Sequence, residues 1–566
     1  MPEADVCRQI IYSNEYSDYL VEFAGGVEDI EQNYEPACIQ VINNKFAVIH
    51  KEGSSRNEGI RFGYTSLPKC YGLLDTSNLE NIGVLRLRRQ PFLDLLGSGV
   101  LIAVIDTGID FTHPAFLTAD NRTRIAAIWD QSVEDGTPPE GFLYGANYSE
   151  EQINEALQSE NPFSVVPIRD VSGHGTFMAG IAAGNDLPDE DFSGVAPLAQ
   201  LVIVKLKQAK SYLRGIYGIP EDVECFQEND IMMAVKYVAD QAQRLNRPIS
   251  ICLGIGTNQG SHDGASYLNE YLDRMGRTLG IAITLAGGNE GNRGHHYYGS
   301  MTQRGETQDI ELVIGEADRG LTMELWGNIP SLFSVAFISP TGEYVEKISA
   351  RLGQRQTIDF LLENTVIDIF YALLEQRSGA ELIWMHFTDP TPGVWTIRVF
   401  AESPTGGSFN VWLPMEQFIS RETHFLAPDP YITICGPGDG LVPITTATYN
   451  HQNNSLYLDS SRGFTRTGLI KPDIAAPGVN VYGPIPGGRY AQRTGSSIAS
   501  AHTAGVAALL LEWGVLDQNY VIMGTNEVKN LMIRGARRSD IVYPNREWGY
   551  GMLDLYGIFE SLRITM

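Results

Sequence analysis

Four near-continuous apolar runs mark the middle of the chain, at residues 100–105, 200–205, 249–253 and 281–286. Between the second and third runs, residues 229–240 repeat apolar positions at helical spacing behind a capping residue. Apolar strands that do not alternate with polar positions, and that helices separate, are typical of a parallel sheet covered on both faces. We therefore predict an α/β fold that continues to a C-terminal helix at residues 500–511.

Two other regions have a different pattern. Residues 1–76 contain short strand-like runs next to turn signals, which predict a small α+β unit, at 19–23, 39–42 and 45–50. Residues 300–430 contain β-type runs with Gly- and Pro-rich turns, which predict an inserted antiparallel β-sandwich, at 307–314, 334–338, 394–400 and 409–413. The predicted domains are therefore 1–76, 77–299 together with 431–566, and 300–430.

The composition and charge of the chain limit the classes of partner that we expect. The chain has 566 residues, 43% of them hydrophobic, which is enough for a large core and more than one domain. The 41 Lys and Arg against 68 Asp and Glu give a formal net charge of −27, and no segment concentrates bases with interleaved aromatics. We therefore expect no nucleic-acid partner. No run approaches the roughly 18 apolar residues of a membrane span, so we expect no membrane partner.

The cysteines and the N-terminus indicate the compartment. The six cysteines show no CxxC pair and no metal-ligand spacing, which predicts free and mostly buried thiols at Cys7, Cys38, Cys70, Cys225, Cys252 and Cys435. The N-terminus lacks the apolar core of a secretory signal. We expect the protein to act where it is made, or to leave by a non-standard route.

Two residues are candidates for proton transfer. Asp106 ends the first apolar run, so its carboxylate lies at the carboxyl edge of the sheet, where open α/β proteins place their sites. A carboxylate there is about as often a helix cap or a metal ligand. His174 lies between two glycines at the start of a helix-forming stretch, where a lone histidine is more often structural. If a second group fixes its tautomer, this histidine can take a proton from a hydroxyl and return it to a leaving amine.

Two further residues are candidates for nucleophilic chemistry. Ser497 lies at the start of a long apolar helix, where an isolated serine is usually an N-cap. A nucleophile at this place gains the backbone N–H groups and the positive dipole end, which stabilise an oxyanion. Asn289 lies in a glycine-rich segment and would usually be a turn residue, but its amide can donate to the same oxyanion.

The motifs around these four residues resemble those of the subtilisin-like serine proteases, the subtilases, in that family's order of Asp, His, Asn and Ser. They are VIDTGID at 104–110, GHGT at 173–176, GVAP at 194–197, GNEG at 288–291 and GSSIA at 495–499. A lipase or esterase would instead show G-x-S-x-G and the order Ser, acid, His. The chain departs from the family at Ile498 and Ala501, where a Met and a Pro are usual.

The resemblance implies a serine endopeptidase on a subtilisin-like parallel sheet. Ser497 would be the nucleophile, His174 the general base and then acid, and Asp106 its orienting partner. Asn289 and the Ser497 backbone N–H would form the oxyanion hole. By the same resemblance, five residues would contact substrate, pairing with its backbone or forming the wall of the S1 pocket: Leu253, Gly254, Ala286, Gly287 and Gly288. No cofactor is implied. Some subtilases bind Ca²⁺, but no spacing here identifies such a site, so we predict no metal ligands.

The insert, the missing signal and the segment 71–76 resemble the Csp branch of subtilases from spore-forming anaerobes, which carry a jelly-roll-like insert. This resemblance implies that residues 1–76 are a prodomain, an intramolecular chaperone and inhibitor cut near Thr76. Residues 69–76 would run along Leu253 and Gly254, with Leu73 toward S4. The partners would be a protein or peptide substrate and the cleaved prodomain. The role would be limited proteolysis of another zymogen, as in spore germination, in the cytoplasm or associated with the spore. The alternative is a catalytically silent pseudoprotease that acts as a sensor or binding module, although here all three triad residues are present.

Overall fold

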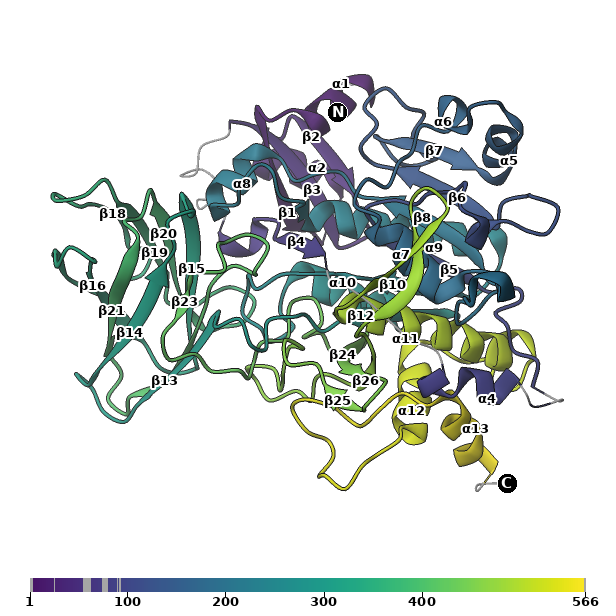
Figure 1. Ribbon diagram of the computed structural model, residues 1–566. Helices are drawn as coiled ribbons and strands as arrows, with labels where there is room; N and C mark the ends of the chain where they lie inside the picture. The colour runs from purple at the N-terminus through teal and green to yellow at the C-terminus, as the bar shows by residue number, and fades with distance from the viewer. Residues whose placement is uncertain are drawn as a thin grey trace.

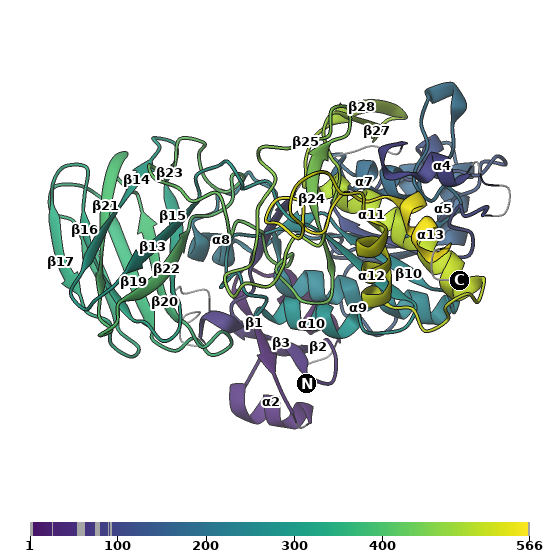
Figure 2. The same cartoon turned by 90° about the horizontal axis from the view of Figure 1, so that it is seen from below.

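The structure is a computed structural model that describes residues 4–24, 26–53, 63–73, 80–88, 90 and 93–563. Three parts can be followed in Figure 1: an N-terminal domain at the top, an α/β core on the right and an insert of antiparallel strands on the left. Seen from below in Figure 2, the N-terminal domain projects from the core on the side of helix α10 (Tyr267–Met275).

The core is built on a sheet with the strand order β25-β24-β12-β10-β5-β8-β6-β7, in which β26 also pairs with β24. Its centre is parallel: β5 (Leu101–Asp106) lies between β8 (Gln200–Lys205) and β10 (Ile249–Leu253), and β12 (Ile281–Ala286) follows β10. The outer strands are β6 (Ile125–Asp130), β7 (Ala146–Ser149), β24 (Ile444–Asn450), β25 (Ser455–Leu456) and β26 (Ile474–Pro477). The four apolar runs are thus the four central strands, and the predicted α/β fold is confirmed.

Successive side chains of β5 point to opposite faces of the sheet, and both faces are covered. Ile102 and Val104 join one hydrophobic cluster, whereas Leu101, Ala103 and Ile105 join another. The helices on the first face are α7 (His174–Ala183) and α11 (Ser496–Leu511), and those on the second are α9 (Glu228–Leu245) and α10. This burial on both faces explains why the central strands read as continuous apolar runs.

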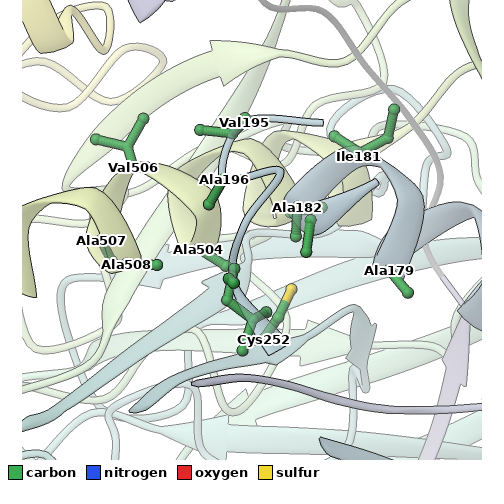
Figure 3. Packing of buried hydrophobic residues seen from close by; sticks show 14 of the residues in the cluster. Ala179, Ile181, Ala182, Val195, Ala196, Cys252, Ala504, Val506, Ala507 and Ala508 are labelled. Atoms are coloured by element: carbon green, nitrogen blue, oxygen red, sulfur yellow. The ribbon is translucent and has the colours of Figure 1, made fainter. Parts of the chain in front are cut away.

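Helices α7 and α11 pack closely through small side chains (Figure 3). Ala179 and Ala182 of α7 and Ala504 of α11 belong to the same cluster. A Cβ atom on Gly505 would lie 2.4 Å from the Cβ atom of Val195, so the helix needs glycine there. Every residue of both helices is buried, and a helix that is apolar on all sides is a core helix.

The apolar stretch of α11 continues into a π-helical turn, η5 (Glu512–Leu516). By length and composition alone, residues Ser496–Leu516 could cross a membrane, and they are the one such stretch among the described residues. However, 89% of its apolar 18-residue segment is buried inside the protein. It is therefore the central helix of the fold.

The prediction that residues 500–511 form the last helix was wrong. The helix begins earlier, at Ser496, and two more helices follow, α12 (Thr525–Gly535) and α13 (Leu555–Arg563). They pack on each other, and α13 also contacts α4 (Val84–Arg88). Both are short and amphipathic and lie between irregular loops, so they give a weaker pattern than α11.

The insert consists of two antiparallel sheets that pack face to face around one hydrophobic cluster. The first has the order β13-β22-β15-β20-β19-β18 and the second β17-β16-β21-β14-β23. In chain order the strands are β13 (His296–Met301), β14 (Thr307–Ile314), β15 (Gly320–Gly327), β16 (Phe333–Ile338), β17 (Tyr344–Ile348), β18 (Arg355–Asp359), β19 (Val366–Ala372), β20 (Glu381–Thr388), β21 (Gly393–Ala401), β22 (Gly407–Trp412) and β23 (His424–Phe425).

The N-terminal domain is a three-stranded sheet with helices, as its pattern predicts. Its strands are β1 (Tyr16–Glu22), β2 (Cys38–Val41) and β3 (Phe46–Glu52), in the order β1-β3-β2, with α1 (Ala4–Tyr12) and α2 (Val27–Tyr34).

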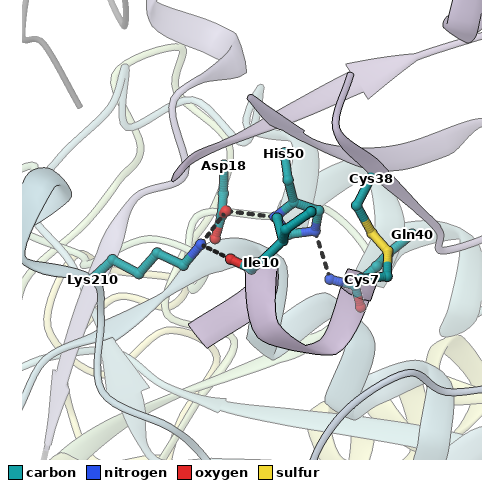
Figure 4. Close-up of a disulfide and its surroundings, with 7 residues drawn as sticks. All are labelled: Cys7, Ile10, Asp18, Cys38, Gln40, His50 and Lys210. Atoms are coloured by element: carbon teal, nitrogen blue, oxygen red, sulfur yellow. Dashed lines mark hydrogen bonds and ion pairs between the residues drawn. A yellow bond between two sulfur atoms is a disulfide. The ribbon is translucent and has the colours of Figure 1, made fainter. Parts of the chain in front are cut away.

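The expectation of six free thiols was wrong, because Cys7 and Cys38 form a disulfide between α1 and β2 (Figure 4). These residues are far apart in sequence and meet only when the domain folds. The other four cysteines are free and buried.

All three parts of the chain share one hydrophobic cluster. It contains Tyr19 and Val21 of the N-terminal domain, Leu213 of the core, and Trp326 and Trp384 of the insert.

The remaining elements are η1 (Tyr64–Ser66), β4 (Cys70–Leu73), η2 (Glu80–Ile82), η3 (Pro114–Phe116), α5 (Glu150–Gln158), α6 (Pro162–Val165), η4 (Pro188–Glu190), α8 (Ser211–Tyr217), β9 (Phe226–Gln227), β11 (Ile255–Gly256), β27 (Val481–Ile485) and β28 (Arg489–Arg493).

Candidate active site

Three side chains from separate segments form one hydrogen-bonded chain. His174 Nδ1 lies 2.7 Å from Asp106 Oδ1, and His174 Nε2 lies 3.0 Å from Ser497 Oγ. All three residues are buried, with His174 the most exposed at 3%. Because Nδ1 donates its proton to the carboxylate, the lone pair of Nε2 faces the hydroxyl. In this tautomer the imidazole can accept the serine proton.

The fold delivers Asp106 and His174 to the same sheet edge. Asp106 is the last residue of β5, and its Oδ1 also accepts hydrogen bonds from the Thr107 N–H at 2.8 Å and the Thr107 hydroxyl at 3.2 Å. His174 is the first residue of α7. A Cβ atom on Gly175 would lie 2.2 Å from the Gly108 carbonyl oxygen, so the glycine allows the helix to start this close to the strand end.

Asp170 is a residue of this site that the sequence analysis missed. Its carboxylate accepts hydrogen bonds from the N–H groups of Gly173 at 2.9 Å and Thr176 at 2.7 Å, so it caps α7. It also accepts from the hydroxyls of Thr176 at 2.6 Å and Thr107 at 2.8 Å. Asp170 therefore ties the helix that begins with His174 to the residue that follows Asp106. An acidic residue shortly before a helix start was the available signal.

Ser497 occupies the second position of α11, and the N-cap is Gly495. The usual interpretation of a serine at a helix start, an N-cap, therefore does not hold here. Gly495 has φ 151°, a backbone conformation that favours glycine. The first N–H groups of a helix lack partners within the helix, and the dipole makes this end positive. A negative oxygen that forms beside Ser497 would be stabilised at this place.

Asn289 lies in the loop after β12 and faces the same helix start. Its Oδ1 accepts a hydrogen bond from the Ser496 N–H at 3.0 Å. With the carbonyl side of the amide bound in this way, the Nδ2 group is left to donate elsewhere. The neighbouring Glu290 N–H donates to Ser461 at 3.0 Å, and the Gly288 N–H donates to Ser496 at 3.2 Å, so the loop is fixed on both sides.

Gly254 borders the site directly. A Cβ atom added to it would lie 2.9 Å from Ser497 Cβ and 3.2 Å from His174 Cε1. Any side chain here would press on both residues, which is a physical reason for a glycine. Leu253 is the last residue of β10 and is fully buried, so its side chain belongs to the core.

Ala286, Gly287 and Gly288 run from the end of β12 toward Asn289. The Gly287 carbonyl accepts from the Cys435 N–H at 2.9 Å. A Cβ atom on Gly288 would lie 2.4 Å from Cys435 Sγ, so this segment rests on Cys435 without room for a larger residue. Burial raises the pKa of the Cys435 thiol well above its ordinary value, which keeps it protonated.

A segment of the N-terminal part pairs with two short strands of the core. Strand β4 is the middle of a three-stranded sheet, with β11 on one side and β9 on the other. Leu73 pairs with Ile255 and Gly72 with Gly256, both antiparallel. The observed pairing therefore involves the two residues after Leu253 and Gly254 and not those two themselves. Thr76 and the segment 74–79 lie outside the described residues.

No group of three or more His, Cys, Asp or Glu side chains that could hold a metal ion occurs in the part of the chain that the structure describes. The three-residue chain at Ser497 is by itself sufficient for acyl transfer chemistry, since it contains a nucleophile, a base and an orienting acid.

Comparisons with known proteins found a family and individual proteins to which this chain is similar. The model of the subtilase family matches residues 97–551. The chain is similar to the C5a peptidase of Streptococcus pyogenes, with 23% identity over 447 residues that cover 73% of this chain and 35% of that protein. It is also similar to the subtilisin-like protease SBT3 of Solanum lycopersicum, with 24% identity over 466 residues that cover 73% and 55%. The chain thus spans about a third of the length of the C5a peptidase.

Among solved structures, the CspB protease of Clostridium perfringens has a similar fold, with a TM-score of 0.76 and 31% identity. The match covers 86% of this chain and 97% of that one. It therefore extends well beyond the α/β core alone.

Proposed function

Since this chain belongs to the subtilase family, we propose that it is a serine endopeptidase in which Asp106, His174 and Ser497 form the catalytic triad. One observation carries the proposal: the continuous hydrogen-bonded chain from Asp106 Oδ1 through the imidazole to Ser497 Oγ, at 2.7 and 3.0 Å. Each group in this chain has one role, and the order of groups fits proton transfer from the serine.

The reaction proceeds in two halves. His174 Nε2 takes the proton of Ser497 as Oγ attacks the carbonyl carbon of the scissile bond, and Asp106 stabilises the imidazolium that forms. The imidazolium then protonates the leaving amine, the C–N bond breaks, and an acyl-enzyme remains. In the second half, His174 takes a proton from water as its oxygen attacks the ester carbon. The bond between that carbon and Ser497 Oγ then breaks, the imidazolium returns its proton to Oγ, and the carboxylic acid product is released.

The oxyanion of each tetrahedral intermediate would lie between Asn289 Nδ2 and the Ser497 N–H. The Ser496 N–H bond to Asn289 Oδ1 supports this role, because it occupies the amide oxygen and leaves the Nδ2 group to act as a donor. Such a donor acts mainly in the transition state and is commonly worth about 2.7–4 kcal/mol.

Residues 1–76 serve, in this proposal, as a prodomain that the enzyme itself cuts near Thr76. Strand β4 supports this, because it fills the position between β11 and β9 that a bound peptide strand would take. Backbone pairing of this kind allows the cleaved tail to remain as an inhibitor. The insert also contacts this domain, because Arg377 pairs with Glu22. The same side chain binds the core, where it pairs with Glu270 and donates to the Ala265 carbonyl at 2.7 Å.

For the biological role we propose limited proteolysis of another zymogen, as in spore germination, in the cytoplasm or associated with the spore. The similarity to the Clostridium perfringens CspB protease supports this. Leu253, Gly254, Ala286, Gly287 and Gly288 would line the substrate cleft and the S1 pocket, and no cofactor would be required.

Self-cleavage of the chain provides a test of the proposed function. N-terminal sequencing of the purified protein should find a new terminus between residues 73 and 79 in the wild type and only the original terminus in Ser497→Ala. A new terminus in Ser497→Ala, made without other proteases present, would rule out self-cleavage. A cleavage profile of peptide libraries by the wild type and by Ser497→Ala then tests the endopeptidase activity itself.

A further inference from the structure

Glu290 follows Asn289 directly, and its carboxylate is buried where the insert joins the core, with the side chain 3% exposed. Its Oε2 accepts a hydrogen bond from His295 Nδ1 at 2.5 Å, and its Oε1 accepts one from the Glu416 N–H at 3.2 Å. His295 comes just before β13 and Glu416 comes after β22, and these two strands pair with each other. One carboxylate next to Asn289 therefore binds the same end of two strands of the insert.

The backbone on both sides of Asn289 is held by Ser461. The Ser461 N–H donates to the Gly288 carbonyl at 3.0 Å, and the Ser461 hydroxyl accepts from the Glu290 N–H at 3.0 Å. The Asn289 side chain faces the start of α11, where the Ser496 N–H donates to its Oδ1. The direction of the Asn289 Nδ2 group therefore depends on how closely this short segment is fixed.

A second link leads from Glu290 to the residues beneath the same loop. Asn258 Nδ2 donates to Glu290 Oε2 at 3.1 Å, and Asn258 Oδ1 accepts from Cys435 Sγ at 3.3 Å. The Cys435 N–H donates to the Gly287 carbonyl at 2.9 Å. Hydrogen bonds thus connect the Glu290 carboxylate with the residue two positions before Asn289.

The Glu290 carboxylate is ionised, and its three partners are donors. Burial raises the pKa of Glu290, but His295 and the hydrogen bonds from Glu416 and Asn258 hold it below its ordinary value. A buried carboxylate is stable only where donors satisfy it, and hydrogen bonds to a charged acceptor are stronger than neutral ones. The three donors therefore define one position for the carboxylate, and with it the position of the Glu290 backbone.

We propose that Glu290 is a positioning residue that acts through Asn289: its bonds with the insert hold the loop so that Asn289 Nδ2 points at the oxyanion. The inference rests on the proposed endopeptidase function and on the role of Asn289 in it. A catalytic donor that is displaced by about 1 Å can cost on the order of a hundredfold in rate. The insert thus contributes to turnover through its contact with Glu290.

The test is a double-mutant cycle on one fluorescent peptide, with turnover normalised by active-site titration so that unfolded protein is not counted. Glu290→Gln should lower kcat by about tenfold to hundredfold with little change in KM, because the amide offers one acceptor oxygen to three donors. In an Asn289→Ala background the same substitution should lower kcat by less than about twofold, since the donor that it positions is already absent.

His295 tests the same contact from the side of the insert, also where Glu290→Gln yields no folded protein. His295→Leu removes the donor and should lower kcat only while Asn289 is present. His295→Asn should keep most of the wild-type kcat, because asparagine Nδ2 can take the place of the imidazole Nδ1. Glu422→Gln is the matched control, at an exposed carboxylate of the insert, and should keep the parent kcat in both backgrounds.

An unchanged kcat in Glu290→Gln overturns the inference, and so does a loss that appears in KM instead. A loss of the same size in the Asn289→Ala background also overturns it, because Glu290 would then act independently of Asn289. An equal loss in Glu422→Gln overturns it as well, since the effect would come from the general charge of the insert. If the wild type cleaves no peptide at all, the proposed function has failed, and this outcome is distinct from cleavage that Glu290→Gln leaves unchanged.

Discussion

The N-terminal domain and the catalytic core each contain a buried Asp–His pair of nearly the same geometry. Nδ1 of His50 lies 2.6 Å from Asp18 Oδ1, and Nδ1 of His174 lies 2.7 Å from Asp106 Oδ1. The pairs differ in what the second nitrogen faces. In the N-terminal pair it faces a side-chain amide, whereas in the core pair it faces the hydroxyl of a serine at a helix start. The Asp–His contact alone therefore does not identify a catalytic site.

In the N-terminal pair, His50 and Asp18 each bind further polar side chains, and some of these belong to the core (Figure 4). Gln40 occupies His50 Nε2 at 2.9 Å. On the other side, Asp18 accepts from Lys210 at 2.7 Å and from Gln227 at 2.8 Å, both residues of the core. No nucleophile is within this set, and every member is buried. This network attaches the N-terminal domain to the core. The Asp106–His174 pair is instead arranged for proton transfer from Ser497.

The largest effect should come from the core pair. His174→Ala and Ser497→Ala should each abolish peptide hydrolysis, because the triad acts as a unit, and the double variant should lose little more. His50→Gln changes the other pair and should retain hydrolysis by the processed enzyme. Initial rates on one fluorescent peptide make the comparison. A double variant that is lower than each single one by a further thousandfold would contradict the shared mechanism.

Asn289→Ala should give the next largest loss of turnover, about 100- to 1000-fold, with little change in KM. The reason is that its amide donates mainly to the oxyanion of the transition state. Steady-state kinetics on the same peptide separate kcat from KM. An unchanged kcat would remove Asn289 from the oxyanion hole.

Asp18→Asn should weaken the attachment of the N-terminal domain by about 3–5 kcal/mol, because it leaves the buried Lys210 without its counter-charge. The variant is best measured by thermal unfolding in a Ser497→Ala background, where self-cleavage is blocked. Asp29→Asn, at an exposed position of α2, is the control and should unfold like its parent. Equal unfolding of Asp18→Asn and Asp29→Asn would mean that the network does not hold the domain.

Acid should weaken the same attachment by a smaller amount. Burial lowers the pKa of His50 below its ordinary 6.5, and the Asp18 carboxylate opposes this, while Lys210 and Lys207 add to it. Undocked His50 therefore binds a proton more readily than docked His50, so stability falls as the pH drops below about 6.5. Although burial raises the pKa of Asp18, Lys210 and His50 hold it well below its ordinary value, so Asp18 stays charged.

The pH effect can be measured on the same Ser497→Ala background. Unfolding temperatures at about pH 7 and about pH 5 should differ more for this protein than for the version that also carries His50→Gln, since glutamine does not titrate. An identical pH dependence in the two proteins would exclude His50 as its source.

The site residues that can be predicted from the sequence are those whose signal is local. Asp106, at the end of an apolar run, and Ser497, at the start of an apolar helix, lie where strand and helix patterns indicate, and short motifs surround both. Asp170 was not predicted, because its role depends on hydrogen bonds with residues of two segments that are far apart in the chain. The Cys7–Cys38 disulfide was missed for the same reason. The pairing of Leu73 with Ile255, two residues beyond Leu253, depends on strand register, which the sequence of one strand alone does not specify.

The central claim is that Ser497, activated by His174, is the nucleophile. Reaction of the processed protein with a fluorophosphonate, followed by mass spectrometry of the peptides, tests it most directly. We expect a single adduct on Ser497, which is lost in His174→Ala and kept in His50→Gln. Absence of an adduct on Ser497 in the wild type, or equal labelling in His174→Ala, would contradict the account.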